Sequence, residues 1–295
     1  MATSRIQQRM QAEPLAIALN TVAPRESKRV RKVSAEALEV QVAALEQDRR
    51  QVYQELFEAA QVQRRLSGAR HVERAGFEIA SEVFPIRHLA GDFITTIEIK
   101  EQVWIALGDI EGKGLAAAMW FTHLVSLIRC HALADMNVAS VMTRVNRDLC
   151  GLQPSPPLTA MVLLAIDSSA RPIEYCNAGH PSPLAVRRDG QVERLEVGGP
   201  LLGVLSGATY ESGRVELGAG DLLLGCSDGV LECHNEKDED FGYTRVITQA
   251  RKHADDSARA ILFSILGAVQ DFAGDTTRQD DVSVLVIRPA KDRRQ

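Results

Sequence analysis

The feature that most constrains how this 295-residue chain can fold is a series of nine short apolar runs. Pairs of helical stretches follow the third and the eighth of these runs. Runs of this length are typical of β-strands, and helices placed between groups of strands favour packed sheets covered by helices. The sequence therefore predicts an α+β sandwich. The expected strands are 77–84, 93–99, 103–107, 158–166, 172–176, 184–187, 192–195, 221–225 and 282–287, and the expected helices are 115–133, 138–149, 244–252 and 257–272.

A helix with a heptad seam is expected before these strands, over 34–67. Ser34 is the predicted N-cap, Glu36 lies in the first turn, and Ser67-Gly68 would end the helix. Mostly apolar residues follow a 4-3 spacing over about four heptads, which indicates a coiled coil and a homodimer through 38–66. An amphipathic helix lying on its own domain is the alternative. The seam positions are Leu38, Val42, Leu45, Arg49, Val52, Leu56, Ala59, Gln63 and Leu66.

Charge and cysteine content narrow the class of protein. The 39 acidic and 34 basic residues give a net charge of −5, which disfavours nucleic-acid binding. No apolar run approaches the ~18 residues that span a bilayer, so no membrane partner is expected. The five cysteines have an odd count and no CxxC spacing, which favours reduced thiols and a cytoplasmic protein. Residues 1–33 are polar and are predicted to form a disordered tail.

Aspartates stand at the ends of several expected strands. Asp92 precedes one strand and Asp109 follows another, Asp228 follows a third, and Asp280-Asp281 precede the last. In antiparallel sheets the start of one strand lies beside the end of its neighbour, so these carboxylates are expected to gather at one edge. Clustered carboxylates repel one another unless a cation neutralises them, and hard oxygen ligands select Mg²⁺ or Mn²⁺. A turn or cap role is the alternative for each aspartate alone.

Five segments in order resemble the SpoIIE/RsbU-type branch of the PPM (PP2C-like) serine/threonine phosphatases over nearly the whole globular part. They are 90–93 (AGDF), 108–114 (GDIEGKG), 177–180 (NAGH), 226–232 (CSDGVLE) and 280–284 (DDVSV). The resemblance implies a PP2C-like α-β-β-α sandwich over 75–290, preceded by the coiled-coil helix. It also implies two Mn²⁺ or Mg²⁺ ions that activate a water molecule for attack on phosphorus, without a covalent phosphoenzyme.

By the same resemblance, individual residues acquire expected roles at the site. Asp92, Asp109 and Asp228 would be catalytic metal ligands, and the backbone carbonyl of Ile110 would assist. Asp280 would complete the site, with Asp281 as the alternative. Lys113 is a candidate for binding the anionic substrate, or a residue that only decorates the next helix. His180, in a turn, is expected to be structural.

Three positions depart from the family pattern. Thr95 stands where a second acid is usual, Glu111 where serine is common, and Ser283 where threonine is common. Thr95 would weaken the metal site or shift water contacts near it, and Glu111 would either tighten metal binding or repel the substrate. A cysteine-dependent phosphatase is disfavoured because no cysteine has an arginine six positions later.

The predicted function is a metal-dependent phosphoserine/phosphothreonine protein phosphatase of a bacterial partner-switching pathway. By resemblance, its substrate would be a phosphorylated STAS-domain anti-sigma factor antagonist, and its regulatory input would come from a separate partner protein or from the tail. The alternative is a pseudophosphatase that binds a partner without turnover. The intact aspartates favour the enzyme.

Overall fold

The computed structural model describes residues 34–152, 156–167 and 172–290, so the predicted tail 1–33 lies outside the described residues. The chain divides into two units, residues 1–49 and 50–295. The long helix α1 (Ala35–Leu66) begins in the first unit and ends in the second. As predicted, Ser34 caps it, since the Ser34 hydroxyl accepts the backbone N–H of Ala37 at 3.2 Å.

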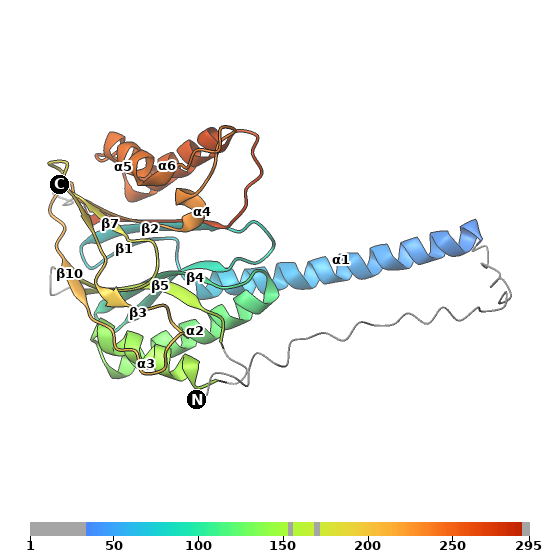
Figure 1. The fold of residues 1–295 in the computed structure, drawn as a ribbon, viewed down its shortest axis with the longest axis horizontal. Coiled ribbons are helices and arrows are strands. Elements are labelled where there is room, and N and C mark those ends of the chain that lie inside the picture. The colour runs from blue at the N-terminus through green and yellow to red at the C-terminus, as the bar shows by residue number, and fades with distance from the viewer. Residues whose placement is uncertain (1–33, 153–155, 168–171, 291–295) are drawn as a thin grey trace, which may run out of the picture. The chain divides into compact units, whose positions relative to one another are not determined.

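Two six-stranded sheets form the centre of the second unit within the described residues (Figure 1). The first has the order β1-β2-β12-β11-β7-β8, and the second has the order β10-β6-β5-β4-β3, with β9 beside β6. The bounds in the first sheet are β1 (His71–Arg74), β2 (Phe77–Phe84), β7 (Leu184–Val186), β8 (Val192–Arg194), β11 (Leu222–Cys226) and β12 (Val282–Pro289). Those in the second are β3 (Asp92–Ile99), β4 (Gln102–Ile110), β5 (Thr159–Asp167), β6 (Ile173–Ala178), β9 (Gly198–Gly199) and β10 (Gly213–Val215).

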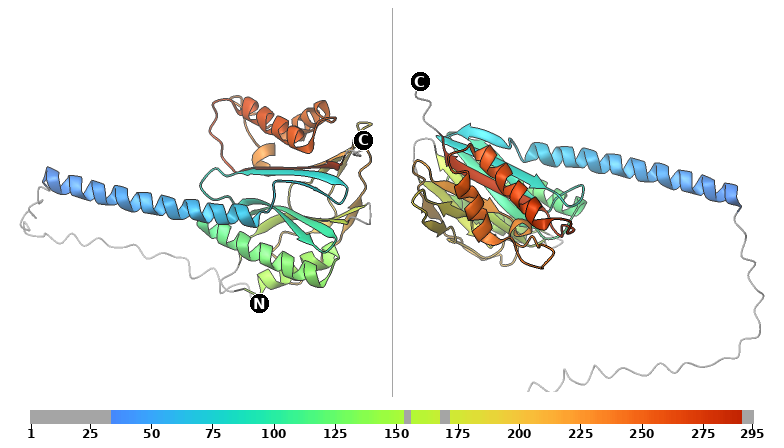
Figure 2. Two further views of the ribbon diagram at one scale, coloured as in Figure 1. Left: turned by 180° about the vertical axis from the view of Figure 1, so that it is seen from behind. Right: turned by 90° about the horizontal axis from the view of Figure 1, so that it is seen from above.

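Helices cover the outer faces of both sheets. In Figures 1 and 2, α5 (Gly242–Lys252) and α6 (Ala258–Ala273) lie over the first sheet, and α2 (Leu115–Ala134) and α3 (Val138–Cys150) lie over the second. The short helix α4 (Asp228–Leu231) follows β11. Separate apolar clusters fill the two helix–sheet layers and the space between the sheets, where Ile105, Leu223 and Leu285 meet. The predicted α+β sandwich is therefore confirmed as an α-β-β-α arrangement.

Boundary differences between the predicted and observed elements are small. The expected strand 103–107 is observed as Gln102–Ile110, and the expected helix 115–133 as Leu115–Ala134. Short edge strands were missed: β1, β9 and β10 contain too few apolar residues to show a period of two. Helix α3 begins where Asn137 accepts the backbone N–H of Ser140, a cap that the sequence pattern did not single out.

The heptad seam of α1 changes character along the helix. Leu38, Val42, Leu45 and Val52 are exposed, Leu45 by 68%. In the last heptad, Leu66 packs against the apolar cluster beneath α2, and the Gln63 amide donates to the carbonyl of Ala90 at 3.1 Å. The end of the helix therefore lies on its own domain, as the alternative interpretation expects. The exposed apolar residues of the seam are earlier, as far as Val52, and Phe57 and Val62 are exposed off the seam. The coiled coil stays a prediction.

Candidate active site

Strands β3 and β4 bring Asp92 and Asp109 together. The two residues are direct partners in the antiparallel register, at the start of β3 and near the end of β4. Gly91 lies against the loop after β4: a Cβ on Gly91 would meet Asp109 Oδ1 and the carbonyl of Ile110 at 3.0 Å each. The close approach requires glycine here, and it puts the Ile110 carbonyl beside the Asp109 carboxylate.

Strands β11 and β12 bring Asp228 and the acid pair to the same place. The Ser227 hydroxyl accepts the backbone N–H of Ser283 at 3.0 Å, which ties the end of β11 to the start of β12. A Cβ on Gly229 would stand 1.9 Å from the Asp281 carbonyl oxygen, so only glycine allows this contact. Asp228 therefore begins α4 directly beside Asp280-Asp281.

The two acids of the pair have different partners. Both oxygens of Asp281 are occupied, because they accept the backbone N–H groups of Ile86 at 2.7 Å, Gly91 at 2.7 Å and Asp92 at 3.3 Å. Asp280 Oδ1 instead accepts from the Lys113 ammonium at 2.8 Å and from the backbone N–H of Asp281 at 2.9 Å. Asp281 is 2% exposed, whereas the Asp280 side chain is 47% exposed. Lys113, a candidate substrate ligand, thus contacts a carboxylate in this state.

The electrostatics of the cluster follow from burial and like charge. Burial first, and then the charges of Asp228, Asp280 and Asp281, raise the pKa of Asp109 to about 6 against the opposing charge of Lys113. The pKa of Asp92 is raised well above its usual value, first by burial and then by Asp109 and Asp281, against the hydroxyls of Ser227 and Ser283. The other aspartates predicted from strand ends therefore all lie within electrostatic reach of Asp109.

This donor set fits a cation. Asp92 is 3% exposed and its Oδ2 has no hydrogen-bond partner in the described residues, which is costly for a carboxylate unless a cation binds it. In that part of the chain, no three His, Cys, Asp or Glu side chains yet converge closely enough to hold a metal ion. Because Asp280 contacts Lys113 and Asp281 contacts backbone amides, these side chains would have to shift for a cation to bind.

Thr95 and Glu111, which depart from the family pattern, have structural partners. The Thr95 hydroxyl donates to the carbonyl of Leu66 at 3.0 Å, so the position joins β3 to the end of α1. Glu111 Oε2 accepts the backbone N–H of Leu158 at 3.2 Å and thereby ties the loop after β4 to the start of β5. Neither contact is to a carboxylate of the cluster. Positive φ values at Gly112 and Gly114 allow the turn from this loop into α2.

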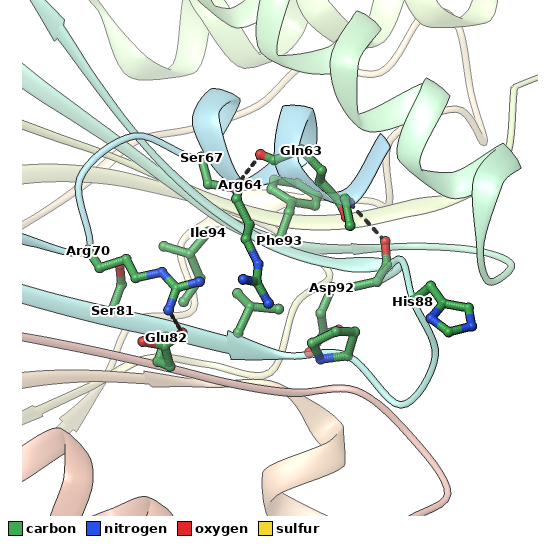
Figure 3. Close-up of a pocket in the computed structure, with 14 residues that line it drawn as sticks. Gln63, Arg64, Ser67, Arg70, Ser81, Glu82, His88, Asp92, Phe93 and Ile94 are labelled. Atoms are coloured by element: carbon green, nitrogen blue, oxygen red, sulfur yellow. Dashed lines mark hydrogen bonds and ion pairs between the residues drawn. The ribbon is translucent and has the colours of Figure 1, made fainter. Parts of the chain in front are cut away.

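Two cavities adjoin the carboxylates. One of about 50 Å³ lies between the end of α1 and β2–β3, and Figure 3 shows Arg64 of α1 and Asp92 of β3 on its walls. Gln63 and the Arg70–Glu82 ion pair border it. The other, of about 450 Å³, is lined by Asp228 and Asp280 together with polar residues that include His234, Asn235 and Arg278. The second cavity therefore opens beside Asp228 and Asp280.

The surroundings of His180 and Cys226 do not favour a catalytic histidine or a cysteine nucleophile. His180 is buried in a turn, where the Asn177 side chain accepts its backbone N–H at 2.9 Å, and burial lowers its pKa to about 4. The imidazole is therefore neutral, as expected of a structural residue. Burial raises the pKa of the Cys226 thiol to about 12, so no thiolate nucleophile forms there. The five cysteines are free.

Several residues that support the site were missed from the sequence. Ser227 was quoted only as part of a motif and Ser283 only as a departure from the family pattern, yet their bond aligns β11 with β12 beneath the carboxylates. Gln63 appeared only as a polar defect in the heptad seam. That defect was the available signal, because a polar residue on an apolar stripe often has a specific partner, here Ala90.

Two stacked sheets between helical layers, with strand-end carboxylates at one edge, are the fold of PP2C-like protein serine/threonine phosphatases. The SiaA-PP2C domain of Pseudomonas aeruginosa matches this structure with a TM-score of 0.68 at 20% identity, over 82% of this chain and 98% of that domain. The RsbU and RsbW domains of Rv1364c from Mycobacterium tuberculosis match with a TM-score of 0.60 at 23% identity, over 73% of this chain and 61% of that one. These likenesses establish the fold.

The sequence comparison identifies the family. The model of the family described as Stage II sporulation protein E (SpoIIE) matches residues 100–290, so this chain belongs to the SpoIIE family. Among its relatives, the phosphoserine phosphatase RsbU of Bacillus subtilis (strain 168) is 25% identical over 236 residues, which are 78% of this chain and 68% of RsbU. Fold and family place the chain among the PP2C-like protein serine/threonine phosphatases. None of its described helices has the length and apolarity needed to cross a bilayer.

Proposed function

We propose that this protein is a metal-dependent phosphoserine/phosphothreonine phosphatase of a bacterial partner-switching pathway. The observation that carries the proposal is the buried carboxylate of Asp92, whose Oδ2 lacks a partner and which lies beside Asp109 in the strand register. Two other strands bring Asp228, Asp280 and Asp281 within electrostatic reach of Asp109. Membership of the SpoIIE family and similarity to RsbU support the same activity.

The proposed cofactors are two Mn²⁺ or Mg²⁺ ions. Asp92, Asp109, Asp228 and Asp280 would hold them, with the Ile110 carbonyl as an additional oxygen ligand. Asp281 is the weaker choice because three backbone N–H groups already occupy its oxygens. When bound, such ions supply Lewis-acid activation of water and neutralise charge on the phosphoryl oxygens.

The chain's own residues organise the site for this chemistry. Asp281 fixes the backbone of the loop that presents Asp92, and the Ser227–Ser283 bond fixes Asp228 relative to β12. Glu111 holds the loop that carries the Ile110 carbonyl. The cavity of about 450 Å³ beside Asp228 and Asp280 has room for side chains of a protein substrate next to its phosphorylated residue.

The proposed substrate is a phosphorylated STAS-domain anti-sigma factor antagonist. The family resemblance of the five motifs and the similarity to RsbU support this choice. A folded substrate would contact the enzyme through more of its surface than the phosphorylated residue alone. This remote binding would favour the folded substrate over small phosphate esters.

A comparison of substrates tests this proposal. With Mn²⁺ present, we expect kcat/KM for a folded phosphoserine STAS domain to exceed that for a peptide carrying the same phosphoserine by at least about 10²-fold, because only the folded domain supplies remote binding energy. Phosphate release measured with a coupled colorimetric assay gives both values, and a phosphotyrosine peptide is the control. Equal values for domain and peptide would refute a docked STAS substrate.

We also propose that α1 forms a homodimer through its exposed seam, and that a separate regulatory protein acts on the enzyme through this region. Replacing Leu45 and Val52 with lysine puts charges on the seam, so we expect the mass in multi-angle light scattering to fall from dimer to monomer. Gln47→Lys and Gln54→Lys, off the seam, form the matched control. An unchanged mass in the seam variant would exclude this interface.

A further inference from the structure

Lys113 connects the two sheets across the carboxylate edge. It lies in the loop between β4 and α2, and its ammonium reaches the segment that leads into β12. There it donates to Asp280 Oδ1 at 2.8 Å and to the carbonyl of Gln279 at 3.1 Å. The ammonium therefore occupies one oxygen of a carboxylate that we assign to cation binding.

Asp280 is the member of the acid pair that is free to move. Leaving its present position would cost Asp281 three backbone hydrogen bonds, whereas the partners of Asp280 among the described residues are only Lys113 and its neighbour's N–H, both on Oδ1. The Lys113–Asp280 pair is substantially exposed on both sides. Exposed ion pairs are weak, so a divalent cation can displace the ammonium from this carboxylate.

We propose that Lys113 is a positioning residue that competes with the cation for Asp280 and, once displaced, turns to the anionic phosphoryl group of the substrate. The first half of this inference rests on the proposed cation site, and the second half rests on the proposed phosphatase activity. In the cation-free protein, the ammonium is the counter-ion of Asp280. With a cation bound, Asp280 would be one of its ligands, and the freed ammonium would be available to the phosphoryl group of the substrate.

A purely structural role for Lys113 leads to the opposite expectation. If the Lys113 contacts to Asp280 and Gln279 served only to hold two loops together, their removal would loosen the carboxylate cluster and weaken cation binding. Competition instead means that removing the ammonium strengthens cation binding. The sign of the change in Mn²⁺ affinity therefore separates the two roles.

The experiment is a calorimetric titration of MnCl₂ into the cation-free full-length protein. We expect Lys113→Met to bind Mn²⁺ roughly two- to fivefold more tightly than wild type, the range that follows from the loss of an exposed ion pair. Lys113→Arg, which keeps the pair, should bind as wild type does, and Lys252→Met on α5 controls for the loss of one positive charge. Unchanged or weaker binding by Lys113→Met would overturn the proposal.

A double-mutant cycle distinguishes competition for Asp280 from general electrostatic repulsion between the Lys113 ammonium and Mn²⁺. In an Asp280→Asn background, Lys113→Met should leave Mn²⁺ affinity unchanged, because the contested carboxylate is gone. Tightening of the same size in that background would mean that Lys113 does not act through Asp280. None of these titrations requires turnover. Failure of the proposed phosphatase activity would appear separately, as wild-type enzyme that binds Mn²⁺ without releasing phosphate.

The second half of the proposal has its own kinetic readout. At saturating Mn²⁺, Lys113→Met should raise KM for a phosphoserine substrate at least about tenfold, because a charge-assisted contact to phosphate is lost. Lys113→Arg should restore most of the loss. An unchanged KM would overturn the proposal that the freed ammonium contacts the phosphoryl group. The competition for Asp280 is tested separately, by the Mn²⁺ titrations.

Discussion

Asp109→Asn lowers the turnover of phosphoserine substrate at saturating Mn²⁺ by at least about 10³-fold, or about 4 kcal/mol of transition-state stabilisation. The expected loss is large because Asp109 lies opposite Asp92 in the strand register and within reach of the charges of Asp228, Asp280 and Asp281. By the family resemblance, Asp109 would be a ligand of both proposed ions. Initial rates of phosphate release by wild type and variant give the value.

The same variant should be the more stable protein when cations are absent. In EDTA at pH 7.5, Asp109→Asn removes a partly buried charge that its neighbours repel. Solvent screening of this carboxyl limits the gain to about 1 kcal/mol, or about 2–4 °C in Tm. Asp189→Asn, in the β7–β8 turn, is the matched control and should change neither activity nor stability. An Asp109 variant that is inactive because it is unfolded would contradict this prediction.

Saturating Mn²⁺ raises the melting temperature of the wild-type protein by about 5–10 °C. At a free concentration 100 times Kd, binding to the native state contributes about 2.7 kcal/mol, and a domain of this size gains about 2–4 °C for each kcal/mol. Differential scanning calorimetry with EDTA and with MnCl₂ measures the shift. Asp109→Asn should show less than half of it, because a shared ligand is missing.

The pH dependence of this stabilisation has a definite sign. In the cation-free protein the pKa of Asp109 is raised to about 6, and that of Asp92 is also raised. The contribution of Asp109 to stability is therefore fully present below its ordinary pKa near 4 and is lost as the pH rises through about 6. That of Asp92 is lost in the same direction, as the pH rises through its raised pKa. The gap in Tm between EDTA and Mn²⁺ should widen from pH 5 to pH 7.5. A gap that narrows over this range would mean that the carboxylates are not the cation ligands.

Much of this structure was predictable because its determinants are local. Alternating apolar runs bounded by turns gave the central strands, and antiparallel pairing alone implied that Asp92 and Asp109 would meet. Whether an aspartate lies at the start or at the end of a strand follows directly from its position in the sequence. The convergence of Asp228 with Asp280-Asp281 required the same reasoning for one more pair of strands.

The remaining features depend on contacts between distant segments. Which acid of the pair is free is decided by backbone N–H groups at Ile86, Gly91 and Asp92, almost two hundred residues earlier in the chain. Thr95 could not be assigned from its own neighbours either, because its partner is the carbonyl at the end of α1. No local pattern in the sequence encodes such loop-to-loop distances.

Phosphate release from a phosphoserine STAS domain, with cations removed and then restored, tests most directly whether the strand-end carboxylates form a metal-dependent phosphatase site. We expect no release in EDTA, full release after addition of excess Mn²⁺, and at most a residual rate from Asp228→Asn under the same conditions. Release in EDTA, or equal rates for wild type and Asp228→Asn at saturating Mn²⁺, would contradict the proposed site. Binding of the phosphorylated domain without any release would identify the protein as a pseudophosphatase.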